Sequence, residues 1–291
     1  MTGALRPRRS ILYMPGSNPR ALEKARTLPA DGLIFDLEDA VAPDAKDDAR
    51  EKVSGALKQG GYGHRETIVR VNGLSTPWGH ADLVAAATSG ADAVLLPKVE
   101  SADSVRQALA VLDQAGGPAT LPLWAMMETA LGMLHAEEIA SASPRLAAFV
   151  MGTSDLAKEL HAAHTALRLP MITALGLCML AGRAFSLTLL DGVHLDLDDD
   201  EGYSASCLQG LELGFDGKTL IHPKQIEAAN RTFAPDEATL AQAEKIITAH
   251  ENATAEGKGV VVVDGRLVEN LHVEDAKRQV QLADAIRAMT A

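Results

Sequence analysis

The sequence predicts a (β/α)8 barrel, the TIM-barrel fold, followed by a C-terminal extension of helices and one hairpin. Short apolar runs alternate with helical patterns along most of the chain, as they do in a parallel sheet wrapped by helices. Eight such strand–helix units fit before residue 232, which is the number that closes this barrel. No Pro/Ser-rich linker divides the region, so we expect a barrel domain over residues 1–232 and an extension over residues 233–291.

The predicted strands are runs rich in Val, Ile, Leu, Met or Ala, with turn-forming residues on both sides. They are expected at residues 10–14, 32–35, 67–73, 93–97, 121–127, 146–151, 191–195 and 218–223. Helical patterns follow the strands, and each ends near a Gly, a Pro or a polar cluster. They are expected from residue 19 and at residues 46–57, 77–87, 102–114, 132–142, 156–167, 170–187 and 203–213.

Beyond the barrel, the pattern predicts a helix over residues 235–250, an exposed hairpin over residues 257–265 and a final helix over residues 273–289. A helical arm past a closed barrel needs a surface on which to pack. We therefore expect the extension to act as a lid and as a contact between subunits of a homo-oligomer, a trimer or a hexamer.

Charge and cysteine content exclude several classes of protein. The chain has 27 basic and 39 acidic residues, a net charge of −12, which argues against nucleic acid as a partner because phosphate backbones bind basic surfaces. Cys178 and Cys207 are too few for a disulfide framework. The apolar run after the first arginines is too short for a signal peptide, and no run reaches membrane-spanning length. We expect a soluble, cytoplasmic protein.

Two acids follow neighbouring predicted strands. Glu128 comes directly after the strand at 121–127, and Asp155 comes shortly after the strand at 146–151. In parallel sheets the ligand lies beyond the carboxyl ends of the strands. Two acids aimed at one point repel unless a cation lies between them, and oxygen ligands favour magnesium or manganese. The alternative is that each acid only caps or begins a helix.

Charged residues gather at other strand ends as well. Asp36, Glu38 and Asp39 come at the end of the second strand and fit either a site or a solvated loop. Arg70 lies inside an otherwise apolar run. A buried arginine is costly unless it is paired, so we expect Arg70 to reach an acid or an anionic ligand rather than to face solvent.

Six motifs resemble those of the citrate lyase β-subunit and malyl-CoA lyase family. In chain order they are SILYMPGSNPR at 10–20 with EKA at 23–25, LEDAVAP at 37–43, VRVNG at 69–73, LPKVE at 96–100, META at 127–130 and GFDGK with IHP at 214–223. Each motif alone is weak, but the ordered set spans nearly the whole chain and is specific.

The resemblance implies the same barrel and a magnesium-dependent acyl-CoA lyase. Members cleave or form 3-hydroxyacyl-CoA thioesters in a reversible Claisen-type reaction. The substrate would be of the malyl-CoA, citramalyl-CoA or citryl-CoA type, and the products a small 2-oxo acid and an acyl-CoA. Glu128 and Asp155 match the positions that bind the metal. Arg70 matches the arginine that contacts the oxo acid and the thioester carbonyl, where it would stabilise the enolate.

Other roles follow from the same resemblance. Tyr13 and Lys24 match positions that line the path of CoA, and Lys24 would supply a local cation for its phosphates. Ser154 and His222 lie beside family substrate contacts. Glu269 departs from the family pattern, because the lyases carry an Asp there that reaches a neighbour's active site. Its carboxyl could still act as an acid or a base, or it could be only a surface acid on a lid.

Three further hypotheses stay open at this point. The first is a thioesterase that hydrolyses malyl-CoA-type substrates on the same scaffold. The second is the β subunit of a citrate lyase complex that depends on an acyl carrier protein. The third, an aldolase acting on free pyruvate, is weaker because it needs no path for CoA.

Overall fold

The computed structural model describes residues 5–255, 257 and 260–290 of the 291-residue chain. The chain divides into two compact units, Arg8–Arg231 and a second unit made mostly of the residues from Thr232 onward. The first unit is a closed barrel of eight parallel strands with helices between them, which confirms the predicted fold class.

The barrel strands pair in the order of the sequence, and the last strand pairs with the first. They are β1 (Ser10–Pro15), β2 (Gly32–Asp36), β3 (Glu66–Arg70), β4 (Ala93–Leu96), β5 (Leu123–Met127), β6 (Leu146–Met151), β7 (Thr188–Asp191) and β8 (Gly217–Leu220). The prediction for the seventh strand was wrong, because the strand ends at Asp191 and residues 192–195 form the loop that follows it.

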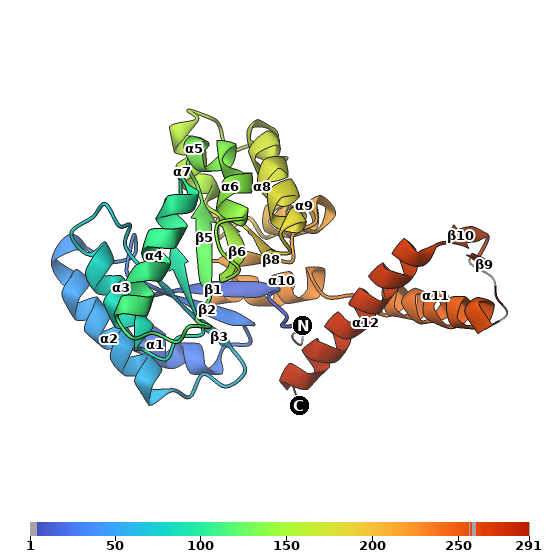
Figure 1. Ribbon diagram of the computed structural model, residues 1–291, viewed down its shortest axis with the longest axis horizontal. Helices are drawn as coiled ribbons and strands as arrows, with labels where there is room; N and C mark the ends of the chain where they lie inside the picture. Colours follow the sequence, from blue (N-terminus) through green and yellow to red (C-terminus); the bar gives the residue numbers. More distant parts are fainter. Residues whose placement is uncertain (1–4, 256, 258–259, 291) are drawn as a thin grey trace. The chain divides into compact units, whose positions relative to one another are not determined.

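The connecting helices cover the outside of the barrel, where α2, α3 and α4 lie side by side in Figure 1. They are α1 (Pro19–Lys24), η1 (Ala25–Thr27), η2 (Pro43–Ala45), α2 (Lys46–Gln59), α3 (Gly79–Ala87), α4 (Ala102–Gln114), α5 (Ala130–Leu134), α6 (Ala136–Ala140), α7 (Thr153–Glu159), η3 (Leu169–Met171), α8 (Ile172–Ala184), α9 (Asp200–Leu213), η4 (Pro223–Gln225) and α10 (Ile226–Thr232). Two helix predictions were wrong in part. The helix expected at 132–142 is broken at His135, and residues 160–167 lie in a loop. In the described part of the chain, no helix combines the length and the apolarity needed to cross a membrane.

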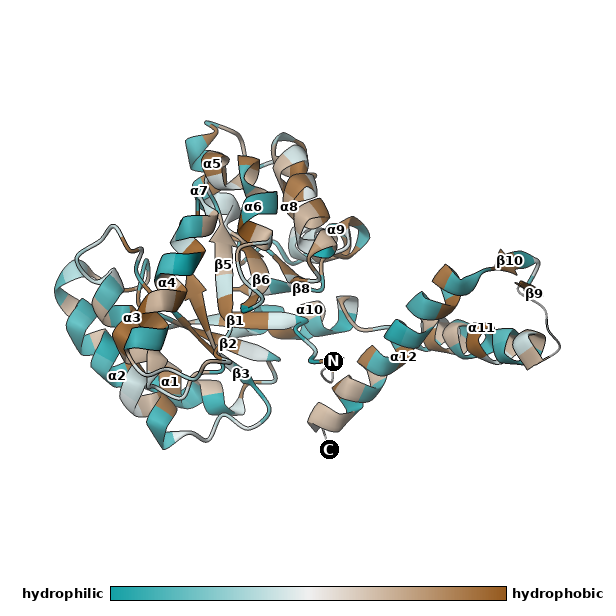
Figure 2. Ribbon diagram, viewed as in Figure 1, coloured by the Kyte–Doolittle hydropathy of each residue, from teal (hydrophilic) through white to brown (hydrophobic). Residues whose placement is uncertain are grey.

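Alternate residues of each strand fill the barrel interior, as the two-residue period of a strand requires. Figure 2 shows hydrophobic residues concentrated on the central strands and hydrophilic ones on the outer turns of α2 and α4. One buried cluster joins residues from seven of the eight strands: Ile11, Ile34, Ile68, Ala93, Leu95, Trp124, Met126, Ala148, Val150 and Leu190. Tyr13 and Met126 lie toward the carboxyl ends of their strands, so the upper layer of this core borders the site.

Two ion pairs link the amino ends of the first strands. Arg9 donates from Nε and Nη2 to the two carboxylate oxygens of Asp31, each at 2.8 Å. Arg8 makes the same two-pronged contact with Glu66, at 2.6 and 2.8 Å. Both acids are buried, and such planar pairs are among the stronger charge-assisted hydrogen bonds. The segment that enters β1 is thereby tied to the beginnings of β2 and β3.

A buried ionic contact also fixes the strands that close the barrel. Lys218 and Asp191 are both fully buried, and Lys218 Nζ lies 2.7 Å from Asp191 Oδ2. Arg168, from the loop after α7, reaches Asp191 Oδ1 at 2.6 Å. Burial raises the pKa of Asp191, but the two cations lower it by more, so the net pKa is below its usual value. The loop that carries Arg168 is therefore fastened to the end of β7.

The second unit contains two long helices and a short hairpin. They are α11 (Glu237–Ala255), β9 (Val261–Val263), β10 (Arg266–Val268) and α12 (Asn270–Thr290). The helices pack on each other, and the strands pair antiparallel. Asp264 and Gly265 form the turn with φ angles of 47° and 78°, the left-handed geometry that favours an Asp-Gly pair. The prediction of a hairpin is confirmed, but its bounds were wrong, because the second strand follows the expected residues 257–265. Lys258 and Gly259 lie outside the described residues.

Candidate active site

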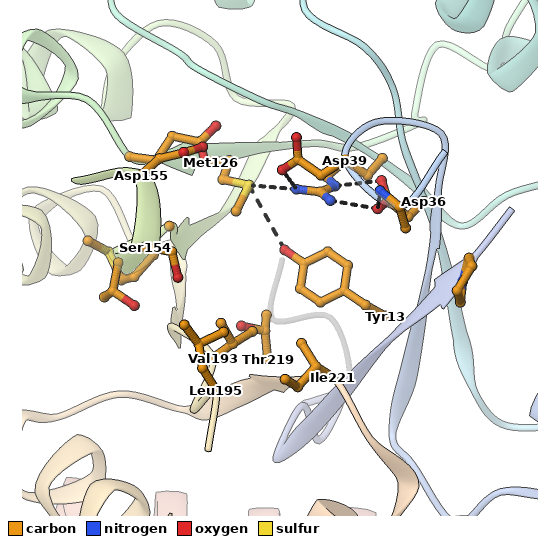
Figure 3. Close-up of a pocket in the computed structure, with 17 residues that line it drawn as sticks. Tyr13, Asp36, Asp39, Met126, Ser154, Asp155, Val193, Leu195, Thr219 and Ile221 are labelled. Carbon is orange, nitrogen blue, oxygen red and sulfur yellow. Dashed lines mark hydrogen bonds and ion pairs between the residues drawn. The ribbon is translucent and has the colours of Figure 1, made fainter. Parts of the chain in front are cut away.

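A cavity of about 420 Å³ opens at the carboxyl ends of the barrel strands. Its lining includes five charged residues that end or follow strands, namely Asp36, Asp39, Arg70, Glu128 and Asp155. Figure 3 shows Asp36, Asp39 and Asp155 on one side of the cavity, with Val193, Leu195 and Ile221 on the opposite side. The cavity thus pairs a polar wall with an apolar one, at the end of the barrel where ligands bind in this fold.

Arg70, the last residue of β3, is held by its neighbour across the sheet. Its Nε donates to Asp36 Oδ1 at 2.7 Å, and its Nη2 donates to Asp36 Oδ2 at 2.6 Å. The same carboxylate accepts the backbone N–H groups of Glu38 and Ala40. Arg70 is 6% exposed, so the prediction that it reaches an acid is confirmed. The clamp fixes the guanidinium plane and leaves Nη1 facing Glu38 and Asp39.

Tyr13, on β1, lies against the face of that guanidinium. The carbon of the Arg70 guanidinium is 4.8 Å from the ring centroid, within the range of a cation–π contact. The Tyr13 hydroxyl donates to Met126 Sδ at 3.9 Å, and a thioether is a weak acceptor. Burial raises the pKa of Tyr13 and Arg70 lowers it by less, so the phenol stays neutral. Its hydroxyl keeps the capacity to hydrogen-bond a ligand.

Glu128 directly follows β5 and is 1% exposed. Its Oε1 accepts the backbone N–H of Lys98 at 2.8 Å. Its Oε2 packs on Gly152, where an added Cβ would lie 2.6 Å from that oxygen, so only glycine leaves the carboxylate its space. Burial first, and then the nearby charge of Glu38, raise the pKa of Glu128 to about 8. The hydrogen bond and the charge of Lys98 lower this pKa, but by less than burial and the neighbouring acids raise it.

A series of alternating charges links Arg70 to Asp155, the two lining residues at its ends, through Glu38 and Lys98. Glu38 lies between two cations, with Oε2 3.0 Å from Arg70 Nη1 and Oε1 3.0 Å from Lys98 Nζ. Lys98 Nζ is in turn 3.8 Å from Asp155 Oδ2. Burial raises the pKa of Glu38, although both cations oppose the increase. The series joins the ends of β2, β3 and β4 to the first turn of α7.

Ser154 adds an uncommitted hydroxyl to the cavity. Its Oγ is buried and has no hydrogen-bond partner among the described residues. A buried hydroxyl without a partner costs free energy. The position is therefore suited to a ligand that supplies the missing hydrogen bond.

The donor set of the cavity fits a hard divalent cation. Four carboxylates line it (Asp36, Asp39, Glu128 and Asp155), with Arg70 as the lining cation. The charged donors are all carboxylate oxygens, the ligands that magnesium prefers. In the described part of the chain, no three His, Cys, Asp or Glu side chains are grouped closely enough to hold an ion. Glu128 and Asp155 would therefore be a two-carboxylate set completed by substrate and water, a common arrangement for magnesium.

Three predicted site residues lie outside this cavity. Lys24 is the exposed last residue of α1. His222 is exposed and caps η4, where its Nδ1 accepts the N–H of Lys224 at 3.1 Å. Glu269 is exposed just before α12, in the second unit, and its N–H donates to His272 Nδ1 at 3.0 Å. Roles for these three residues remain predictions.

Two sets of residues at the site escaped sequence reasoning. Lys98 was visible as a charge at a strand end, but nothing in the sequence linked it to Glu38 and Asp155. The second set is the apolar wall, which comprises Val193, Leu195 and Ile221. Val193 and Leu195 were predicted to lie in a strand, and the loop after β7 instead brings them to the cavity.

Comparison with known proteins gives a consistent result. Residues 9–223 match the model of one protein family, described as HpcH/HpaI aldolase/citrate lyase. A protein named (3S)-malyl-CoA thioesterase, from Cereibacter sphaeroides (strain KD131 / KCTC 12085), is 54% identical over 285 residues, which cover 98% of each chain. A protein named L-malyl-CoA/beta-methylmalyl-CoA lyase, from Rhodobacter capsulatus, is 36% identical over 94% of this chain and 95% of its own.

A solved structure has a fold similar to that of this chain. The protein CitE from Mycobacterium tuberculosis, in complex with magnesium, acetoacetate and coenzyme A, aligns with a TM-score of 0.76. The two chains are 29% identical, and the alignment covers 94% of this chain and 97% of CitE. The ligands of that complex are a divalent metal, a small oxo acid and CoA.

Proposed function

The chain belongs to the HpcH/HpaI aldolase/citrate lyase family, and we propose that it is a magnesium-dependent enzyme acting on a malyl-CoA-type 3-hydroxyacyl thioester. The observation that carries the proposal is one cavity lined by buried Glu128, by Asp155 and by Arg70, whose guanidinium is held by Asp36. Malyl-CoA appears in the names of relatives at both 54% and 36% identity. The substrate is therefore better supported than the bond that breaks.

We propose that Glu128 and Asp155 hold the metal, with magnesium preferred and manganese as a substitute. When bound there, the metal would supply a Lewis acid for the carboxylate and hydroxyl or oxo oxygens of the substrate. Ser154 would donate to or accept from the same acid group through its unpartnered Oγ. The apolar wall would exclude water from the opposite face of the substrate.

The first candidate reaction is carbon–carbon cleavage, the chemistry in the family's name. The 3-hydroxyl loses its proton to a base, the C2–C3 bond breaks, and its electron pair passes to the acyl-CoA as an enolate. Arg70 Nη1 is the donor that Asp36 leaves unclamped, and it would stabilise the enolate oxygen. Protonation of the enolate carbon completes the acyl-CoA, and a 2-oxo acid is the other product.

Glu269 is our candidate for the group that moves these protons. A carboxyl at this position preserves the acid–base chemistry of the shorter Asp that the lyases carry. We further propose that the second unit serves as a lid and as a contact between subunits, so that a homo-oligomer completes the site. Tyr13, Lys24 and His222 would contact the CoA portion or the edge of the acyl group.

Hydrolysis of the thioester is a second candidate, and one observation favours it. The relative that is 54% identical over 98% of both chains is named a thioesterase. In this reaction water adds to the thioester carbonyl, the C–S bond breaks, and the thiolate takes up a proton. Arg70 would then stabilise the oxyanion at the carbonyl instead of an enolate.

A panel of malyl-CoA, citramalyl-CoA and citryl-CoA with magnesium distinguishes the candidates. Free 2-oxo acid and free thiol are followed in parallel. Oxo acid without thiol identifies a lyase, and thiol without oxo acid identifies a thioesterase. Formation of neither product would overturn the proposal for free CoA thioesters. The panel repeated with acyl carrier protein thioesters would then test whether the chain is a carrier-dependent subunit.

A further inference from the structure

We propose that the ammonium of Lys98 is a resident cation of the acid cluster in the metal-free protein, and that a divalent cation displaces it toward solvent. The acid cluster means Glu38, Glu128 and Asp155. The inference rests on the proposed metal site, and it assigns to Lys98 a role in regulating that site. Three features of the structure carry it.

The backbone of Lys98 is fixed at the site in an unusual conformation. Its φ is 50°, in the left-handed region that non-glycine residues rarely occupy. This geometry directs its N–H to Glu128 Oε1 at 2.8 Å. Such backbone strain is found mostly where function requires it. Backbone and side chain of one residue thus touch the cluster independently, and a substitution of the side chain leaves the hydrogen bond to Glu128 in place.

The Lys98 side chain lies closer to one acid than to the other, and it is partly exposed to solvent. Its Nζ lies 3.0 Å from Glu38 Oε1 but 3.8 Å from Asp155 Oδ2, and half of the side chain is exposed. Lys218, by contrast, is fully buried and its Nζ lies 2.7 Å from Asp191 Oδ2, so it has no such freedom. Lys98 can therefore leave the cluster by rotating its own flexible stem, without opening the barrel.

Charge makes the two cations compete. Without a metal, the ammonium is the nearest positive charge to Asp155 that the described residues provide, and it partly offsets the acids that raise the pKa of Glu128. A divalent cation on Asp155 would lie within a few ångströms of the ammonium, where repulsion between like charges is strong in a partly buried site. Occupancy by one cation therefore opposes occupancy by the other.

The test is the affinity for Mn²⁺, measured from the free-ion EPR signal at pH 8 without substrate. Lys98→Met removes the charge and keeps the length of the side chain, and it should bind Mn²⁺ about tenfold more tightly than the wild type. Lys52→Met is the matched control, because Lys52 pairs with Asp48 on α2, and its affinity should equal that of the wild type. If Lys98→Met does not fold, Lys98→Gln replaces it.

Each other outcome is decisive. Unchanged affinity in Lys98→Met would show that Lys98 does not compete with the metal, and weaker binding would show that it supports the ligands instead. Either result overturns the inference while leaving the metal site intact. No Mn²⁺ binding by the wild type would overturn the metal site and the inference together.

Thermal unfolding in EDTA gives a second measurement. The metal-free Lys98→Met protein should have a lower Tm than the wild type, because its acids lose their resident counter-charge. Saturating Mg²⁺ should raise its Tm by more than it raises that of the wild type. Equal shifts on metal binding would contradict displacement.

Discussion

Asp36 grips the guanidinium of Arg70 with both carboxylate oxygens, across adjacent strands at the mouth of the barrel. The bidentate geometry allows one orientation of the guanidinium plane. The same carboxylate also accepts hydrogen bonds from two backbone N–H groups of the turn after β2. Asp36 therefore holds both Arg70 and this turn in place.

Removal of the Asp36 carboxylate should lower catalytic activity and leave the affinity for the metal nearly unchanged. We expect Asp36→Asn to lower kcat/KM about 100-fold, because a misplaced catalytic group is costly even over short distances. Mn²⁺ affinity should stay within about twofold of the wild type, since Asp36 is not a proposed ligand. Steady-state kinetics and metal titration check both expectations.

Asp31→Asn is the matched control for that variant. It breaks a similar buried pair, Asp31 with Arg9, at the opposite end of the barrel. Both variants should lose on the order of 3 kcal/mol of unfolding free energy, as broken buried pairs do. Only Asp36→Asn should lose activity per folded molecule. Equal activity losses in both would mean that the clamp acts through stability alone.

Substitution of either proposed metal ligand, Glu128 or Asp155, should weaken metal binding. Glu128→Gln and Asp155→Asn should each weaken Mn²⁺ binding by about 100-fold or more. This loss exceeds the one expected when a residue that only hydrogen-bonds to a metal ligand is substituted. Isothermal titration calorimetry measures the change. Asp113→Asn, which removes a surface acid paired with Arg145, should bind Mn²⁺ as the wild type does. Retention of full metal-dependent activity in either ligand variant would refute the assignment.

The raised pKa of Glu128 predicts how stability depends on pH without metal. The group moves from an ordinary pKa near 4.5 to about 8 in the folded protein. Between these values the folded state holds a proton that the unfolded state releases, so the unfolding free energy falls as pH rises. The contribution is fully present below pH 4.5 and is lost as pH passes about 8.

Urea unfolding in EDTA from pH 5 to pH 9 measures this effect. The difference in unfolding free energy between the wild type and Glu128→Gln should fall by on the order of 4 kcal/mol and then level off. A difference that stays flat with pH would mean that Glu128 titrates normally. Added Mg²⁺ should reduce the fall, because the metal binds the ionised form.

Glu269 offers a prediction that separates chemistry from metal binding. Glu269→Gln should lower kcat about 100-fold, a typical loss for a general acid or base, while Mn²⁺ affinity stays unchanged. Glu274→Gln, an exposed acid further along α12, should keep full activity. A wild-type rate in Glu269→Gln would leave Glu269 as a surface acid and would leave the metal site untouched.

The sequence was sufficient for the barrel but not for every boundary. The seventh strand was misplaced because the apolar residues of α8 run almost directly into Leu187–Leu190, with no Gly or Pro between them. The break comes instead at Ser186, whose φ is 59°. Residues 160–167 have helical composition but are mostly exposed, and a helix without a face to bury gains little stability.

At the site, the sequence located charges but not their partners. The position of Arg70, Glu128 and Asp155 at strand ends follows from the alternation of strands and helices. The contacts of Glu38 with Arg70 and Lys98 depend on how three different strand ends approach one another, which no local pattern encodes. Glu38 therefore had no predicted role, although it is the acid that joins the two cations.

The ion pairs at the amino ends of the strands have an evolutionary consequence. Arg8, Arg9, Asp31 and Glu66 hold the first strands together, and none of them lines the cavity. Substitutions that alter the cavity therefore leave this fastening untouched, and selection can vary the two ends of the barrel separately. A lineage built this way can exchange one bond-breaking reaction for another while its fold persists, in keeping with relatives of this chain that carry the names of a thioesterase and a lyase.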